Sequence, residues 1–272
     1  MKPEFSVIIP TLNEEKYLPH LLDSLAAQTK KNFEVVVVDG SSRDKTVAEA
    51  NKFKNRIPCL KVIISKTASL PLQRNLGARA STGEWLVFID ADSVMMPYFF
   101  ERVSSYIRKN ETELLTSWCR PDSEKNGDAT ITLLSNIIFE ASISLKRPFT
   151  PGPMTIVARR AYDLVGGYDE EHAFNEDVDF GLRLHKAGIQ LKIIRETLWV
   201  WSMRRLRQKT KLKLFNQYVR SVFPVLFFRT TLKRMPDYMM GGHLYQIDKV
   251  PKKSVLKVYE TKLKKLMNEL VG

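Results

Sequence analysis

Two aspartates separated by one residue, Asp90 and Asp92, are the clearest candidates for chemistry in this chain of 272 residues. They follow the apolar run 85–89, whose composition is typical of a strand buried on both faces of a sheet. In open α/β sheets, ligands bind at the carboxyl ends of strands, and neighbouring carboxylates repel each other unless a cation neutralises them. Oxygen ligands of this kind suit Mg²⁺ or Mn²⁺. Because an Asp-x-Asp pair can also cap the next helix, its interpretation depends on the other motifs.

A third carboxylate, Asp39, ends the apolar run 33–39 and precedes the turn Gly40-Ser41-Ser42. We expect it at the same sheet edge, where a carboxylate can accept hydrogen bonds from a nucleobase. The alternative is an Asx-turn that only orders the two serines. Thr11, Asn13 and Glu14 follow the first strand at this edge, although the last two could instead cap the helix that follows.

Alternating strands and helices must position these residues. The first half predicts strands at 5–10, 33–39, 60–65 and 85–89. Between them it predicts a helix with Leu18, Leu21, Leu22 and Leu25 on its apolar face, and helices at 44–53 and 71–83. The second half predicts helices at 98–110, 129–145 and 178–187, and strands at 114–120 and 155–158. Successive βαβ units of this kind predict an α/β fold, with a doubly wound, mostly parallel sheet and helices on both faces.

The net charge of +13 is concentrated near the C-terminus. Residues 204–265 contain 17 Lys and Arg against three acidic residues, whereas the rest of the chain carries 26 basic and 27 acidic residues. A basic segment on a neutral body indicates an anionic partner: a membrane surface, a lipid phosphate or nucleic acid. Toward the C-terminal end of the chain, lysines alternate with apolar residues over 256–270, a pattern that favours either an anionic bilayer or packing on the rest of the protein.

Neither a transmembrane span nor a signal peptide is evident, so we expect a cytoplasmic protein that can associate with a membrane surface. Cys59 and Cys119 are expected to be buried, reduced thiols in strands. The four histidines are scattered and suggest no zinc site, and His172 is expected at the surface.

Five motifs occur together in a fixed order. They are Pro10-Thr11-Leu12-Asn13-Glu14, the segment 38–46, Gln73-Arg74-Asn75-Leu76-Gly77-Ala78, Asp90-Ala91-Asp92 and Asn175-Glu176-Asp177. This combination resembles family-two inverting glycosyltransferases of the GT-A fold over residues 5–200, and it is far more specific than any single motif.

The resemblance implies a role for each site residue. Pro10, Thr11, Glu14 and Asp39 would hold the base and ribose of a nucleotide-sugar donor, and Arg74 would lie near the nucleotide or the sugar. Asp92 would be the direct ligand of Mn²⁺ or Mg²⁺, with Asp90 nearer the ribose or the ligands around the metal. Asp177 would be the general base, and Glu176 would contact the acceptor. Asn13, Ser41 and Ala91 complete the expected donor-binding set.

The sequence departs from the family pattern after the last predicted core strand. Many relatives have a metal-binding His there, but this chain has Trp201-Ser202-Met203-Arg204-Arg205. The complete set of metal ligands is therefore open. Breaking a sugar–phosphate bond leaves a diphosphate whose charge needs a positive partner, and guanidinium groups bind phosphate oxygens in pairs. Arg204 and Arg205 are thus candidate diphosphate clamps, with an ordinary basic surface as the alternative.

The sequence as a whole predicts a GT-A domain at 1–203 and a basic, largely helical extension at 204–272. The donor-binding half would span 1–110 and the acceptor-binding half 111–203. The expected reaction moves a sugar from a UDP-, GDP- or dTDP-sugar to a hydroxyl of a glycan or lipid-linked acceptor. A polyprenyl-phosphate glycosyltransferase and a non-catalytic sugar- or membrane-binding module remain alternatives. A dinucleotide-binding oxidoreductase is excluded because the Gly-x-Gly-x-x-Gly turn is absent, and nucleic acid is not an expected partner.

Overall fold

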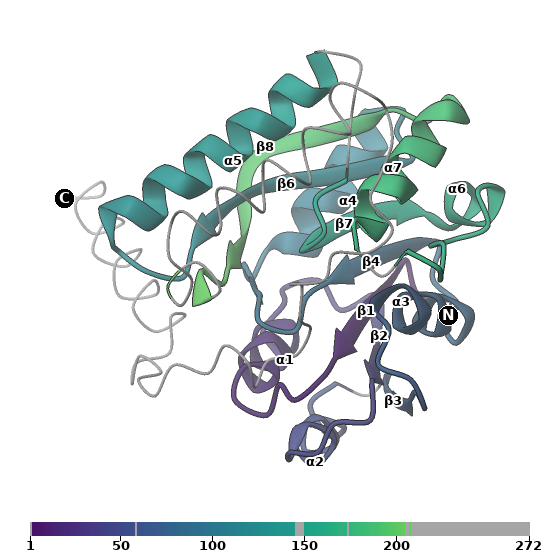
Figure 1. Ribbon diagram of the computed structural model, residues 1–272, viewed down its shortest axis with the longest axis vertical. Helices are drawn as coiled ribbons and strands as arrows, with labels where there is room; N and C mark the ends of the chain where they lie inside the picture. Colours follow the sequence, from purple (N-terminus) through teal and green to yellow (C-terminus); the bar gives the residue numbers. More distant parts are fainter. Residues whose placement is uncertain (1, 58, 145–149, 173, 205–206, 208–272) are drawn as a thin grey trace.

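An eight-stranded sheet forms the centre of the part of the chain that the structure describes, in the order β3-β2-β1-β4-β7-β6-β8-β5 (Figure 1). The structure is a computed structural model that describes residues 2–57, 59–144, 150–172, 174–204 and 207. Helices pack around the sheet, and the predicted α/β class is confirmed.

The strands are β1 (Phe5–Thr11), β2 (Phe33–Asp39), β3 (Leu60–Ile64), β4 (Trp85–Ile89), β5 (Val94–Met95), β6 (Leu114–Pro121), β7 (Met154–Ala158) and β8 (Leu191–Trp201). The helices are α1 (Leu18–Ala26), α2 (Thr46–Asn51), α3 (Leu70–Arg79), α4 (Phe99–Lys109), α5 (Asn126–Ser144), α6 (Arg159–Leu164) and α7 (Glu176–Lys186). The predicted elements are present, and their ends differ from the predicted ones by a few residues.

The first half of the sheet is parallel, as predicted. β1 lies between β2 and β4 and is parallel to both, with Thr11 opposite Asp39 in the register. Every residue of β1, β2 and β4 is buried, which explains why their sequences are continuous apolar runs rather than alternating ones. The loops after these strands therefore meet at one edge of the sheet.

The second half is mixed, which the sequence did not predict. β7 is antiparallel to both β4 and β6, and β5 is antiparallel to β8, while β6 and β8 are parallel. The loop Pro151-Gly152-Pro153 enters β7 at the edge where β4 ends, since Met154 is paired with Ile89. The strand must therefore run back in the opposite direction.

The helix α3 lies unusually close to the sheet because of Gly77. A Cβ at this position would lie 2.4 Å from Ile8 Cγ2 and 3.2 Å from Val38 Cγ2. Ile8 and Val38 belong to β1 and β2, so the glycine lets the helix backbone approach both strands. This approach carries Arg74, about one turn earlier on the helix, into the protein interior, where it is 1% exposed.

Three expectations need comment. Cys119 is buried in β6 as predicted, but the prediction for Cys59 is wrong: this thiol is exposed, because it precedes the edge strand β3 instead of lying in the core. Apart from Arg204 and Arg207, the predicted extension 204–272 lies outside the described residues. Among the described residues, no helix is both long and apolar enough to cross a bilayer.

Candidate active site

The ends of β1 and β2 are joined by side-chain hydrogen bonds around Asp39, which is 1% exposed. Thr11 Oγ1 donates to Asp39 Oδ1 over 3.1 Å, and the backbone N–H of Ser42 donates to Oδ2 over 2.8 Å. The Asx-turn considered from the sequence is therefore present. Ser41 has a left-handed backbone with φ of 63°, and its hydroxyl donates to the carbonyl oxygen of Ser65.

Asn13 and Glu14 do not cap the following helix, because α1 begins at Leu18 and its N-cap is Tyr17. Asn13 has a φ of 55°, and its side-chain Oδ1 accepts a hydrogen bond from the backbone N–H of Arg43 over 2.8 Å. The backbone N–H of Glu14 donates to Thr46 Oγ1 over 2.7 Å. These bonds fix the loop after β1 to the loop after β2, and they leave the Glu14 carboxylate available for another partner.

That partner is Arg204, which comes from the far end of the described chain. Its Nη1 and Nη2 donate to the two oxygens of Glu14 over 2.8 and 2.6 Å. Its Nε lies 2.8 Å from Asp92 Oδ2, and its guanidinium lies over the ring of Tyr17. Arg204 is 4% exposed and Glu14 is 6% exposed. The surface alternative for Arg204 is therefore wrong, whereas Arg205 lies outside the described residues.

This cluster retains an excess of negative charge. Burial raises the pKa of Glu14 to about 7, and the charges of Asp92 and Asp90 add to the rise, although the hydrogen bond and the charge of Arg204 oppose it. Glu14 and Asp92 thus share one guanidinium, and Asp90 adds a further negative charge nearby. A site with this donor set fits a further cation with oxygen ligands, such as Mg²⁺ or Mn²⁺.

A second buried arginine, Arg74, joins the end of β4 to the start of α7. Its Nη1 donates to Glu176 Oε1 over 2.9 Å, and its Nη2 donates to the carbonyl oxygen of Gly152 over 2.8 Å. The same Nη2 lies 3.6 Å from Asp90 Oδ1. The guanidinium also lies 5.0 Å from the centre of the Tyr168 ring. Arg74 therefore holds the motifs Asp90-Ala91-Asp92 and Asn175-Glu176-Asp177 at one place.

Asp177 lies beside this arginine in the first turn of α7. Its Oδ1 accepts a hydrogen bond from the backbone N–H of Val178 over 2.9 Å. A Cβ at Gly152 would lie only 2.6 Å from Asp177 Oδ2, so the carboxylate packs directly on the glycine backbone. The N-cap of α7 is Asn175, in a left-handed conformation with φ of 57°. Asp177 is therefore not the N-cap residue.

The acidity of this pair is set by its surroundings. Burial, followed by the charge of Asp177, raises the pKa of Glu176 to about 7, while Arg74 lowers it. Burial also raises the pKa of Asp177 above its ordinary value, again opposed by Arg74. A carboxylate with a raised pKa is a stronger proton acceptor than an aspartate with its ordinary pKa, which is the property that a general base requires.

The structure brings most of the predicted site residues to one sheet edge. Those found there are Pro10, Thr11, Asn13, Glu14, Asp39, Ser41, Arg74, Asp90, Ala91, Asp92, Glu176, Asp177 and Arg204. The sequence did not single out Gly152 or Tyr17, and it assigned no role to Tyr168. The flanking prolines of Gly152 marked a loop, but not which residue the loop would face.

A separate group of possible metal ligands is formed by Asp169, His172 and Asp179. Their ligand atoms lie within 4.8 Å of one another. His172 is buried rather than at the surface, and its Nδ1 lies 2.8 Å from Asp169 Oδ2. Arg183 Nε lies 2.7 Å from Asp179 Oδ2 and neutralises it. Each of the two candidate cation sites therefore contains an aspartate that is paired with an arginine.

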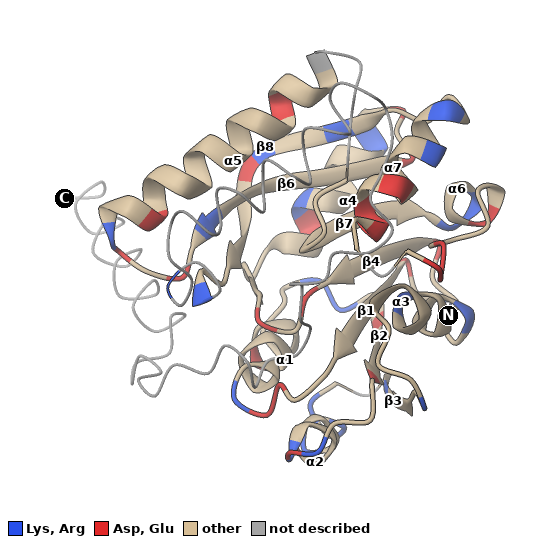
Figure 2. Cartoon of the chain, viewed as in Figure 1, with Lys and Arg blue, Asp and Glu red and all other residues tan. Residues whose placement is uncertain are grey.

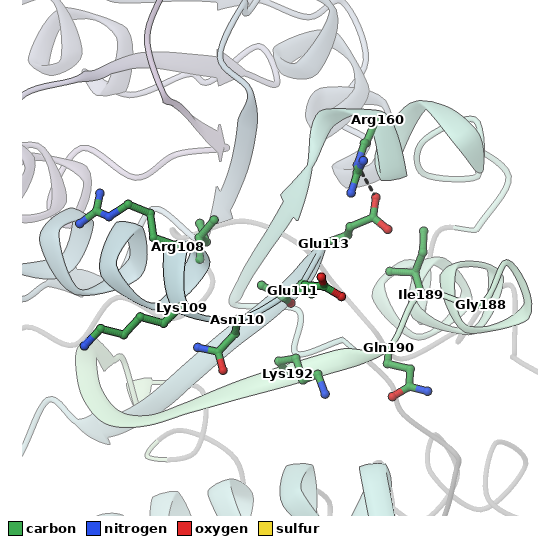
Figure 3. A pocket seen from close by; sticks show the side chains of 12 residues that line it. Arg108, Lys109, Asn110, Glu111, Glu113, Arg160, Gly188, Ile189, Gln190 and Lys192 are labelled. Carbon is green, nitrogen blue, oxygen red and sulfur yellow. Dashed lines mark ion pairs between the residues drawn. The ribbon is translucent and has the colours of Figure 1, made fainter.

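An open depression in the described part of the chain lies away from these residues. Its volume is about 660 Å³, and it lies where α4 ends and β6 and β8 begin, at the opposite ends of these strands from Pro121 and Trp201. Figure 3 shows Arg160 and Glu113 pointing toward each other at its rim, where they form an ion pair of 2.6 Å. It contains none of the predicted site residues, and we assign it no function.

The chain is similar to known glycosyltransferases. The model of the family described as glycosyl transferase family 2 matches residues 6–165. An uncharacterized glycosyltransferase of Haemophilus influenzae is 30% identical over 184 residues, which are 66% of this chain and 61% of that protein. A PGL/p-HBAD biosynthesis glycosyltransferase of Mycobacterium tuberculosis is 32% identical over 187 residues, which are 66% of this chain and 69% of that protein. The chain thus spans less than two thirds of the length of the first of these relatives.

Two solved structures share the fold. Staphylococcus aureus TarS 1–349 in complex with UDP-GlcNAc has a TM-score of 0.64 at 23% identity, over 85% of this chain and 68% of that one. The mannosyltransferase PcManGT from Pyrobaculum calidifontis, in complex with GDP-Man and Mn²⁺, has a TM-score of 0.62 at 19% identity, over 83% of this chain and 68% of that one. At these identities the likeness concerns the fold alone.

Proposed function

This chain belongs to glycosyl transferase family 2 and is a glycosyltransferase, and we propose that it transfers a sugar with inversion, using Asp177 as the general base. The observation that carries this proposal is the position of the Asp177 carboxylate. It is half-buried, packed on the Gly152 backbone and adjacent to the ion pair of Arg74 and Glu176.

The proposed donor is a nucleoside-diphosphate sugar. Fold relatives were solved with UDP-GlcNAc, UDP and GDP-Man, which supports this donor class and leaves UDP, GDP and dTDP open. The loops after β1 and β2, tied together at Asp39 and Asn13, would hold the base and ribose. We propose that residues 1–110 form the donor half and residues 111–203 the acceptor half.

Asp92 and Asp90 would hold Mn²⁺ or Mg²⁺, and a Mn²⁺ complex of a fold relative supports a divalent ion. Such an ion neutralises the negative charge that grows on the leaving diphosphate. Arg204 already lies against Asp92 and can supply positive charge from the protein itself. Guanidinium groups bind phosphate oxygens in pairs, so Arg204 is proposed as a diphosphate clamp, together with Arg205.

The proposed step is a single displacement. The acceptor hydroxyl gives its proton to a carboxylate oxygen of Asp177 while its oxygen forms a bond to the anomeric carbon. The bond from that carbon to the phosphate oxygen breaks, and the diphosphate leaves with the electron pair. The Glu176 carboxylate is buried and accepts a hydrogen bond from Arg74. In this proposal Glu176 contacts the acceptor while it keeps this bond to Arg74.

The acceptor is proposed to be a glycan or a lipid-linked hydroxyl, with a polyprenyl phosphate as the alternative. An acceptor that is already a phosphate anion has little need of a base, whereas a hydroxyl does. The raised pKa of the half-buried Asp177 therefore favours the hydroxyl. The membrane contact expected from the basic segment concerns residues outside the described part of the chain and stays a prediction.

The test is Asp177→Asn, with Asp179→Asn in the same helix as the matched control. The assay follows release of nucleoside diphosphate from UDP-GlcNAc and GDP-mannose with Mn²⁺, and donor binding is measured by calorimetry. A base role predicts a fall in turnover of roughly 10²–10⁴-fold with donor binding retained, whereas the control keeps near-normal turnover. Turnover of Asp177→Asn within a few-fold of the unmodified protein would exclude this residue as the base.

A further inference from the structure

The helix α5 packs on the sheet with its polar side. Its buried residues are Asp128, Thr132, Asn136 and Ser142. Asn136 Nδ2 donates to the carbonyl oxygen of Cys119 over 3.0 Å, and its Oδ1 accepts from the backbone N–H of Cys119 over 3.2 Å. The register between β6 and β8 shifts around this cysteine, so the asparagine satisfies backbone groups at an irregular point of the sheet. A surface helix normally turns its apolar side inward; α5 does the reverse.

The apolar side of α5 faces outward as a continuous stripe. We define the outer stripe as Ala129, Leu133, Leu134, Ile137, Ile138 and Ala141, all of which are exposed. The four large side chains are 51–58% exposed. The stripe extends about 18 Å along the helix at 1.5 Å per residue. A contiguous apolar patch of this kind marks an interaction surface, whereas isolated exposed apolar residues do not.

The charges around the outer stripe are compatible with an anionic partner. No charged residue occurs between Asp128 and Glu140, and Figure 2 shows this uncharged length of α5. Both acids are neutralised: Arg207 lies 2.9 Å from Asp128, and Arg195 lies 2.9 Å from Glu140.

The last described residue of the basic segment, Arg207, lies at this same helix. Arg207 pairs with Asp122 as well as Asp128, and so lies at the first turn of α5. The segment 204–265, with 17 basic and three acidic residues, therefore starts beside one end of the stripe. Lys125 precedes the helix, and Lys146-Arg147 follow it in the sequence.

We propose that the outer stripe of α5 docks on the surface of an anionic lipid bilayer. An apolar helix face flanked by Lys and Arg binds the boundary between headgroups and acyl chains, through apolar burial and attraction to anionic lipids. The stripe supplies the apolar face, and basic residues flank the helix in the sequence, with Lys125 before it and Lys146 and Arg147 after it. α5 starts just after β6 ends at the edge that carries the candidate active site, so this docking would bring that edge toward the bilayer.

The experiment uses the full chain and vesicles of phosphatidylcholine, with and without 30% phosphatidylglycerol. The test variant is Leu133→Gln/Ile137→Gln, which changes two exposed side chains and therefore spares the core. The matched control is Leu164→Gln on α6, where the leucine is 67% exposed but lies outside the stripe. Full burial of one aliphatic side chain contributes about 1.5–3 kcal/mol. Since half of each is already buried, the double variant should lower partitioning roughly tenfold or more.

The expected result is sedimentation of the unmodified protein and of Leu164→Gln with anionic vesicles, and loss of sedimentation for the stripe variant. Donor binding should be equal in all three proteins. The proposal is overturned if the unmodified protein does not sediment, if it binds neutral and anionic vesicles equally, or if the stripe variant binds like the control. Light scattering that shows a dimer converted to a monomer by the stripe variant, without vesicle binding, would assign the stripe to a second copy of the chain instead.

Discussion

Gly152→Ala offers a direct test of how tightly the candidate base must be positioned. The added Cβ would lie 2.6 Å from Asp177 Oδ2 and 3.3 Å from its Cγ. An ordinary carbon–oxygen contact is restored only if the carboxylate moves by roughly 0.5–1 Å. Because the atom that must move is the end of a flexible side chain, the substitution should perturb the site without preventing folding.

The size of the effect follows from this displacement. A misplacement of about 1 Å costs on the order of 10²-fold in rate, so we expect kcat to fall by about 10–100-fold, equivalent to about 1.4–2.7 kcal/mol in the activation barrier. Donor binding should change little, since the three atoms nearest to a Cβ at Gly152 all belong to Asp177. The hydrogen bond from Val178 to Asp177 would weaken, costing about 1 kcal/mol of stability.

The assay is release of nucleoside diphosphate under saturating donor, together with a thermal melt. Gly127→Ala is the control, because a Cβ there meets nothing within 4 Å, and the residue lies in the first turn of α5. If Gly152→Ala keeps kcat within twofold while Asp177→Asn is inactive, the argument that Gly152 fixes the base is refuted. If Gly152→Ala instead abolishes donor binding, Gly152 belongs to the donor site.

Two further predictions concern the cluster around Arg204. Arg204→Gln leaves the buried Glu14 and the half-buried Asp92 without their partner, which should destabilise the protein by about 3–5 kcal/mol. Addition of Mn²⁺ should recover part of the lost melting temperature, and no recovery would argue against a cation at these acids. The pKa of Glu14 is raised from 4.5 to about 7, so the folded state binds more protons than the unfolded state between these values. The contribution of Glu14 to stability is then greatest at low pH and declines as pH rises toward 7. Glu14→Gln should flatten the fall in melting temperature between pH 5 and 8, and an unchanged slope would contradict this assignment.

The sequence predicted the structure correctly where a local pattern of apolar residues determines the element. The apolar runs of β1, β2 and β4 predicted buried strands, and the acids at their ends predicted one shared edge. This reasoning works because the carboxyl ends of parallel neighbours must lie together. It also correctly placed Glu176 and Asp177 at the start of α7.

The sequence was uninformative where the outcome depends on distant partners. Arg74 pairs with Glu176 across 102 residues and Arg204 with Glu14 across 190, and no local pattern identifies such pairs. The antiparallel direction of β7 depends on where its loop enters the sheet. For α5, composition predicted a mostly apolar helix but not that its polar side would face β6, because the backbone groups that Asn136 satisfies arise only when the sheet is formed.

The pairing of Arg204 with Glu14 and Asp92 also affects the order in which parts of the structure can form while the chain is being synthesised. The guanidinium that neutralises both acids leaves the ribosome more than a hundred residues after Asp92. Until then, the loops that carry the acids would hold like charges close together with no internal counter-ion. The nascent chain should therefore form its sheet before it forms a finished donor site. A fragment limited to residues 6–165, the span of the family model, would contain the aspartates but not their neutralising partner.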